Sequence, residues 1–177
     1  MTYTEALQKR WDALMMPNYG TPPIALASGQ GAVVTDVDGK TYLDLLAGIA
    51  VNILGHCHPA VTEAATQQLT TLGHTSNLYA HEPGVALAEA LVTQWGVENA
   101  RVFFCNSGAE ANELAFKLSR LTGRRKLVAT RRAFHGRTMG SLALTGQPEK
   151  QAPFRPLPEG FVHVPYDDVA ALSLIHI

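Results

Sequence analysis

Three small residues, Ser107, Gly108 and Ala109, stand where a short apolar run changes into a helical pattern. The run 101–105 and the pattern 108–122 predict a strand that enters a helix through a turn. The first N–H groups of a helix have no partner within it and carry the positive end of its dipole. Small residues let an anion approach these groups, and a hydroxyl adds a donor. The segment predicts a phosphate site, with an ordinary N-cap serine as the alternative.

A second group of chemically useful residues, Phe134, Gly136 and Arg137, follows the predicted strand 126–130. An aromatic ring can stack on a flat cofactor, and a guanidinium binds a carboxylate through two parallel hydrogen bonds. A core phenylalanine and a solvated surface arginine are the alternative interpretation. Because the phosphate site lies in the same unit, the pattern favours a flat phosphorylated cofactor and an acidic substrate.

Other candidate sites are weaker. The chain contains neither G-x-x-x-x-G-K-[ST] nor G-x-G-x-x-G, so no P-loop or dinucleotide fingerprint competes. The cluster His56, Cys57 and His58 resembles half of a metal site, but no second ligand pair is visible, so we expect no metal. The pair Asp167 and Asp168 is typical of a helix start. No Ser-His-Asp arrangement can be inferred from spacing.

Composition narrows the classes of partner. Charged residues make up 16% of the 177 residues, below the roughly 25% that is typical. We therefore expect extra buried surface at a subunit interface or against a missing piece of the same chain. The net charge of −1 argues against nucleic acid and acidic membrane surfaces as partners.

The expected compartment follows from sequence signals that we do not find. No signal peptide is recognised at the N-terminus. The longest apolar run, 45–51, is far shorter than the roughly 20 residues of a membrane helix. Two cysteines give no disulfide framework and fit a reducing environment. We expect a soluble, cytoplasmic protein with no membrane partner.

The periodicity predicts a mixed α+β region at the N-terminus and an α/β region after it. In the first region, Thr2 and Glu5 are spaced as a capping box, and Asp38-Gly39 is a hairpin signal. The expected elements are a helix over 4–16, strands over 32–36 and 41–45, and helices over 59–72 and 82–95.

The second region alternates strands with helices, which predicts a parallel sheet. The expected elements are strands over 101–105, 126–130 and 161–164, helices over 108–122 and 137–144, and a helix beginning after Asp167. The sheet is unfinished at the end of the chain. We therefore expect a truncated gene product whose last six residues, 172–177, are a foreign tail.

Four motifs together resemble the subgroup III (ornithine-type) aminotransferases, which use pyridoxal 5′-phosphate. They are residues 39–44 (GKTYLD), 55–59 (GHCHP), 106–113 (NSGAEANE) and 133–138 (AFHGRT). The resemblance covers about residues 5–170. It implies the type I fold of these transferases, with an incomplete parallel sheet of the large domain over 71–171 and the N-terminal part of a small α+β domain over 1–70.

The resemblance also implies roles for matching residues. The cofactor-binding set comprises Ser107, Gly108, Ala109, Phe134 and His135. Of these, residues 107–109 would hold the phosphate, Phe134 would stack on the pyridine ring, and His135 would lie beside it. Arg137 would bind the α-carboxylate of the substrate. The active form would be a homodimer, with a small-molecule amino donor and 2-oxoglutarate as substrates.

Within the family, residues 48–52 and 74–79 resemble the branch that acts on N-acetylornithine in arginine biosynthesis. Ornithine, 4-aminobutyrate and succinyl-diaminopimelate specificities stay open, since Arg137 reads only a carboxylate. The family's Schiff-base lysine would lie past residue 177, so we expect no catalytic residue in this chain and no transamination by it alone. A non-catalytic protein with the same fold is the remaining alternative.

Overall fold

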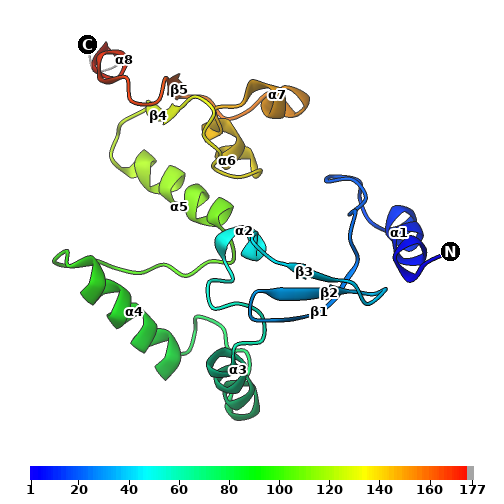
Figure 1. Ribbon diagram of the computed structural model, residues 1–177. Helices are drawn as coiled ribbons and strands as arrows, with labels where there is room; N and C mark the ends of the chain where they lie inside the picture. The colour runs from blue at the N-terminus through cyan, green and yellow to red at the C-terminus, as the bar shows by residue number, and fades with distance from the viewer. Residues whose placement is uncertain (175–177) are drawn as a thin grey trace. The chain divides into compact units, whose positions relative to one another are not determined.

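The computed structural model describes residues 1–174 and divides into two compact units, Met1–His81 and Glu82–Ile177 (Figure 1). The predicted domain boundaries at residues 70 and 171 concern the domains of a complete transferase and stay a prediction. Of the predicted foreign tail, residues 175–177 lie outside the described part of the chain. Residues 172–174 belong to the helix α8 (Val169–Leu174).

The N-terminal unit begins with the helix α1 (Tyr3–Leu14), which the predicted capping box starts. The Thr2 hydroxyl accepts the Glu5 N–H at 3.1 Å, and the Glu5 carboxylate accepts the Thr2 N–H at 2.8 Å. Two backbone donors that a helix start leaves unpaired are thus satisfied. The predicted helix 59–72 is present as α3 (Pro59–Thr71), with proline in its first turn.

Three antiparallel strands form the sheet of this unit in the order β1-β2-β3. The strands β2 (Val33–Asp36) and β3 (Thr41–Leu43) correspond to the predicted hairpin. The strand β1 (Leu26–Gln30) has no counterpart in the sequence analysis. Its second half, Ser-Gly-Gln, has little strand preference of its own, so its pairing with β2 supplies the order.

Asp36 fixes the turn between β2 and β3. Although its side chain is buried, its carboxylate accepts hydrogen bonds from the Tyr42 hydroxyl at 2.8 Å and from the N–H groups of Lys40 and Asp38 at 2.9 and 3.0 Å. The hydrogen bond from Tyr42 is the largest of the effects that lower the pKa of Asp36 below its ordinary value.

A left-handed segment follows β3. The short helical turn α2 (Ala47–Ala50) has positive φ angles at all four residues, from 48° to 62°. Asp44 holds its start by accepting the N–H groups of Leu46 and Ala47, both at 2.9 Å. His56 Nε2 lies 2.8 Å from the other carboxylate oxygen of Asp44. Asp44 therefore connects the start of α2 with His56, which lies beyond the end of α2.

The C-terminal unit contains the helix α4 (Glu82–Trp95), which the sequence predicts with the same bounds. The helix α5 (Gly108–Leu121) and the strand β4 (Leu127–Thr130) follow it along the chain. After them come the elements α6 (Met139–Leu144), α7 (Pro148–Gln151), the 3₁₀ turn η1 (Ala152–Phe154) and the strand β5 (Phe161–Val164). The strands β4 and β5 pair in parallel, as the alternation predicts.

The core of the C-terminal unit centres on α6, which contacts α5, β4 and β5 (Figure 1). Its residues Leu142, Ala143 and Leu144 are buried, as are Ala129 of β4 and Val164 of β5. Among the described residues, no helix is long and apolar enough to cross a membrane.

Two predictions for this unit are wrong. Residues 101–105 are not a strand, because within residues 1–174 they take part in no sheet pairing; an apolar run becomes a strand only where a neighbour supplies the ladder. The predicted helix 137–144 begins later, at Met139 after the N-cap Thr138. The segment before it is instead held by side chains of α5.

The lowered pKa of Asp36 predicts the response of the N-terminal unit to acid. Its folded-state pKa lies below the unfolded one, so its contribution to stability is present above the ordinary pKa of 3.8 and is lost as the pH falls through the folded-state value. We expect Asp36→Asn to lower the urea midpoint at neutral pH and to flatten the acid loss of stability. Tyr42→Phe should give an intermediate curve. Identical pH dependence in Asp36→Asn and the unmodified chain would contradict this assignment.

Candidate functional site

The start of α5 is built by a serine cap. Ser107 has an extended backbone, and its hydroxyl accepts the N–H of Glu110 at 3.2 Å. The Glu110 carboxylate reaches back to the N–H of Asn106 at 2.5 Å. This reciprocal arrangement fixes the direction in which the first turn of the helix points.

Two donors remain at this helix start. Within the described chain, no hydrogen bond uses the backbone N–H of Gly108 or of Ala109, whereas the N–H of Ala111 donates to the Ser107 carbonyl at 3.1 Å. Apart from its chain neighbours and the backbone of its own helix, no atom of the described residues lies within 4 Å of the place where a Cβ of Gly108 would stand. Two aligned N–H groups at the positive end of a 14-residue helix, with open space before them, fit a phosphate group.

The loop that carries Phe134 and Arg137 packs against the same helix. The side-chain amide of Asn112 donates to the His135 carbonyl at 2.7 Å. The Ser141 hydroxyl, just beyond the loop, donates to the Ala109 carbonyl at 2.8 Å. The structure therefore brings the segment 107–109 and the segment 134–137, which are separated in the sequence, into one region of the C-terminal unit.

Glu113 makes the densest set of contacts with this loop. Its Oε1 atom accepts the Thr138 hydroxyl at 2.5 Å and the N–H groups of Gly140 and Ser141 at 2.9 and 3.0 Å. Partial burial raises the pKa of Glu113, but the hydrogen bonds from these three donors outweigh it and hold the pKa below its ordinary value. The carboxylate is therefore ionised at neutral pH and caps the N-terminus of α6 from another helix.

Thr145, at the C-terminal end of α6, also holds the loop before this helix. Its side chain is fully buried, and its hydroxyl accepts the His135 N–H at 3.0 Å and lies 3.2 Å from the Gly136 carbonyl and 3.0 Å from the Ser141 carbonyl. Gly136 has φ of 130°, and a Cβ there would come within 2.7 Å of the Ala109 Cβ. Glycine thus permits the loop to lie directly on the first turn of α5.

The predicted site residues keep accessible surfaces. Phe134 is 55% exposed, with the Lys150 ammonium 6.0 Å from its ring centroid; Arg137 is exposed and His135 half-buried. Reasoning from the sequence missed the contacts of Asn112, Glu113, Ser141 and Thr145. The spacing of Ala109, Asn112, Glu113 and Phe116 could have indicated one contacting face of α5, because residues three and four apart share a helix face.

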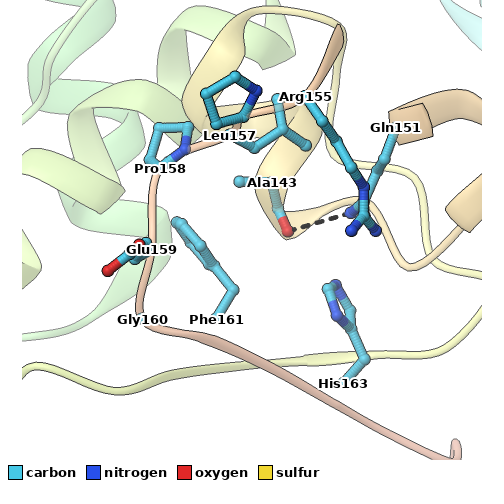
Figure 2. Close-up of a pocket in the computed structure, with 10 residues that line it drawn as sticks. Ala143, Gln151, Arg155, Leu157, Pro158, Glu159, Gly160, Phe161 and His163 are labelled. Atoms are coloured by element: carbon cyan, nitrogen blue, oxygen red, sulfur yellow. Dashed lines mark hydrogen bonds between the residues drawn. The ribbon is translucent and has the colours of Figure 1, made fainter. Parts of the chain in front are cut away.

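A separate depression of about 670 Å³ lies beside α6 and β5 (Figure 2). Gln151, at the right of the view, donates its amide N–H to the Ala143 carbonyl at 3.4 Å. His163 Nε2 is 3.0 Å from the Leu144 carbonyl. None of the predicted cofactor or substrate residues lines this depression. The depression is therefore distinct from the region around the start of α5.

The histidine and cysteine cluster 55–59 has another role. Within the described residues, no group of three or more His, Cys, Asp or Glu side chains could hold a metal ion. His56 pairs with Asp44, and this hydrogen bond is the largest of the effects that lower the pKa of Asp44. Among the described residues, His58 Nδ1 is buried without a hydrogen-bond partner. Within this cluster, His56 links the segment to Asp44 and, through its backbone, to Gly31.

Comparison with known families identifies the chain. The family model for class-III aminotransferases matches residues 14–174. The chain belongs to the class-III aminotransferases. The α/β fold predicted from the four motifs is confirmed by this match and by the similarity to solved transaminase structures.

Curated relatives from actinobacteria are similar over almost the whole chain. The acetylornithine aminotransferase of Mycolicibacterium smegmatis is 75% identical over 167 residues, which cover 94% of this chain and 43% of that protein. The acetylornithine aminotransferase of Mycobacterium tuberculosis H37Rv is 73% identical over 173 residues, which cover 97% and 43%. The chain thus spans less than half the length of these relatives.

Solved structures are similar at lower identity. The ornithine aminotransferase of Toxoplasma gondii superposes with a TM-score of 0.90 at 28% identity, over 99% of this chain and 43% of that one. The taurine:2-oxoglutarate aminotransferase of Bifidobacterium kashiwanohense, solved in complex with PLP and glutamate, gives 0.82 at 29% identity, over 98% and 43%.

The buried Thr145 hydroxyl predicts a measurable loss of stability on Thr145→Val. The substitution keeps the shape but leaves the His135 N–H without its acceptor, which costs roughly 1–3 kcal/mol. Urea unfolding should show this decrease, while Thr71→Val on the exposed surface of α3 should change little. Equal effects of the two substitutions would mean that the Thr145 hydroxyl does not hold the loop.

Proposed function

We propose that the chain is part of an acetylornithine aminotransferase, which transfers the terminal amino group of N-acetylornithine to 2-oxoglutarate in arginine biosynthesis. The observation that carries the proposal is the 75% identity to the acetylornithine aminotransferase of M. smegmatis over 94% of the chain. The ornithine aminotransferase of T. gondii has a similar fold but only 28% identity. Identity therefore favours the acetylated donor over free ornithine, and 4-aminobutyrate and succinyl-diaminopimelate stay alternatives.

The cofactor of the proposed reaction is pyridoxal 5′-phosphate, and the residues at the start of α5 fit its phosphate. The N–H groups of Gly108 and Ala109 would bind the phosphate oxygens, and Ser107 orients the turn that presents them. The exposed Phe134 would cover one face of the ring, with His135 next to it. When bound, such a cofactor acts as an electron sink for the amino acid.

Arg137 would bind a carboxylate group of the amino donor and, in the second half of the reaction, a carboxylate group of 2-oxoglutarate. A planar guanidinium matches a carboxylate with two parallel N–H donors, so one residue can orient both substrates in turn. The segment around it is tied to α5 by Asn112 and Glu113. Its position would therefore stay fixed relative to the phosphate-binding turn.

The proposed assembly is a homodimer in the cytoplasm. Large apolar side chains remain exposed in both units, among them Ile49, Val51, Ile53 and Trp95 at 73–83%. Exposed apolar surface of this extent is typical of contact with further protein. Both cysteines are free, which fits a reducing compartment.

A chimera tests the proposed activity. In the chimera, the 167 residues of the M. smegmatis enzyme that align with this chain are replaced by the aligned residues of this chain. The purified chimera is assayed with N-acetylornithine, ornithine, 4-aminobutyrate and succinyl-diaminopimelate as amino donors. We expect N-acetylornithine to give the highest kcat/KM with 2-oxoglutarate as acceptor. A higher value for ornithine or 4-aminobutyrate would assign the segment to another branch, and an inactive chimera would contradict the function.

The phosphate site predicts weaker cofactor binding by Gly108→Val in this chimera. A branched side chain in the open space before the helix blocks the approach of phosphate to the backbone. Loss of one hydrogen bond to a charged group costs roughly 1.5–3 kcal/mol, which is tenfold or more in Kd. Titration of the apo-chimera with the cofactor measures this Kd. Gly73→Val, at a glycine with equally open surroundings, serves as the matched control.

The carboxylate site predicts a rise in KM for both substrates on Arg137→Ala. Arg137 is exposed in this chain, but in the substrate complex the bound carboxylate would cover it, and loss of one partner of such a covered charged pair costs about 2–5 kcal/mol. Arg137→Lys should restore only part of the affinity, because an ammonium lacks the planar fork. Steady-state kinetics with both substrates measures this, with the exposed Arg124→Ala as control. Unchanged KM values in Arg137→Ala would remove this residue from the site.

A further inference from the structure

The loop between β4 and α6 receives little support from regular secondary structure. Between Arg131, which forms an isolated bridge with Gly146, and the helix α6, residues 132–138 belong to no helix or strand. The loop nevertheless contains both residues that the proposed function assigns to the ring face and to the substrate carboxylate. Backbone hydrogen bonds of Arg132 and Ala133 with Gly146 order the first residues of the loop, so other interactions must set the position of the part around Arg137.

Two adjacent side chains of α5 hold the loop on either side of Arg137. Asn112 binds the carbonyl of His135, two residues before Arg137. Glu113 binds the hydroxyl of Thr138, the residue directly after it, and two further N–H groups. Only residues 136 and 137 lie between the two anchors, so the arginine backbone has little freedom to move relative to α5.

We propose that Glu113 is a positioning residue, whose carboxylate fixes Arg137 for substrate binding while the phosphate site one turn earlier works without it. This inference rests on the proposed function. The separation follows from the contacts, because the N–H groups of Gly108 and Ala109 are presented by the Ser107 cap and receive nothing from Glu113. Asn112 has the corresponding role on the side of His135.

The contact requires a carboxylate at this place. One oxygen accepts three donors, and two of them are N–H groups at the positive start of α6, where a negative charge is favoured. An amide in its place has a weaker acceptor and adds a donor that faces donors. A Cβ on residue 140 would come within 2.5 Å of Glu113 Oε2 and 2.7 Å of Phe116 Cδ1, so Gly140→Ala displaces the carboxylate, together with the Phe116 ring, without removing the charge.

The test compares Glu113→Gln, Gly140→Ala and the exposed control Lys117→Gln in the M. smegmatis chimera. Because a displacement of about 1 Å at a binding group can cost up to a hundredfold, we expect Glu113→Gln to raise the KM for 2-oxoglutarate at least about tenfold. The Kd of the cofactor should change less than about twofold, well under the tenfold that 1.4 kcal/mol represents, because Asn112 still holds the side of the loop that carries Phe134 and His135. Gly140→Ala should reproduce this split, and Lys117→Gln should leave both quantities unchanged.

Hydrogen exchange supplies a readout that does not depend on activity. In Glu113→Gln, the N–H groups of Gly140 and Ser141 should exchange faster, while those of the α5 interior keep their protection. Equal losses of cofactor affinity and substrate affinity would overturn the inference, since they indicate general unfolding of the site, and so would unchanged KM values. If the unmutated chimera is inactive, the proposed function fails by itself. Hydrogen exchange in the 177-residue chain, with and without Glu113→Gln, then tests the role of Glu113 separately. Unchanged exchange at residues 140 and 141 in the variant overturns that role.

Discussion

The first two turns of α5 supply the hydrogen bonds that the loop between β4 and α6 cannot make for itself. A backbone segment outside helices and strands must find partners for its polar groups, and these partners decide its path. Here the partners are Asn112 and Glu113, with Thr145 acting from the other end. The site is thus one body in which a helix start and a distant loop are ordered by the same few side chains.

In this arrangement, the backbone and the side chains have different proposed binding roles. Under the proposed function, the phosphate site would use backbone N–H groups, which any small residues could provide, and a serine that is a common cap. Recognition of a carboxylate would use the guanidinium of Arg137, whose direction depends on the contacts of the loop. The phosphate of the cofactor and the carboxylate of the substrate would then depend on different contacts of α5.

The sequence allows good prediction where local periodicity decides the structure. The helix α4 and the strand β5 have the predicted bounds, and Thr2 and Glu5 form their capping box. Residues 101–105 show where this reasoning stops, because a strand needs a partner that local pattern cannot supply. The strand β1 was missed for the converse reason, since β2 orders a segment that has little intrinsic preference.

The site shows the same limit at the level of side chains. The roles suggested for Ser107, Gly108 and Arg137 came from residue types that chemistry singles out. Asn112 and Glu113 stood within the quoted motif, but their contacts reach loop residues 23 to 28 positions away. A helix pattern gives the face on which such residues lie, whereas the segment they meet is set by the turn after β4. The glutamate is therefore recognisable as a cap only once α6 has been placed beside α5, where its carboxylate becomes an anchor of the loop.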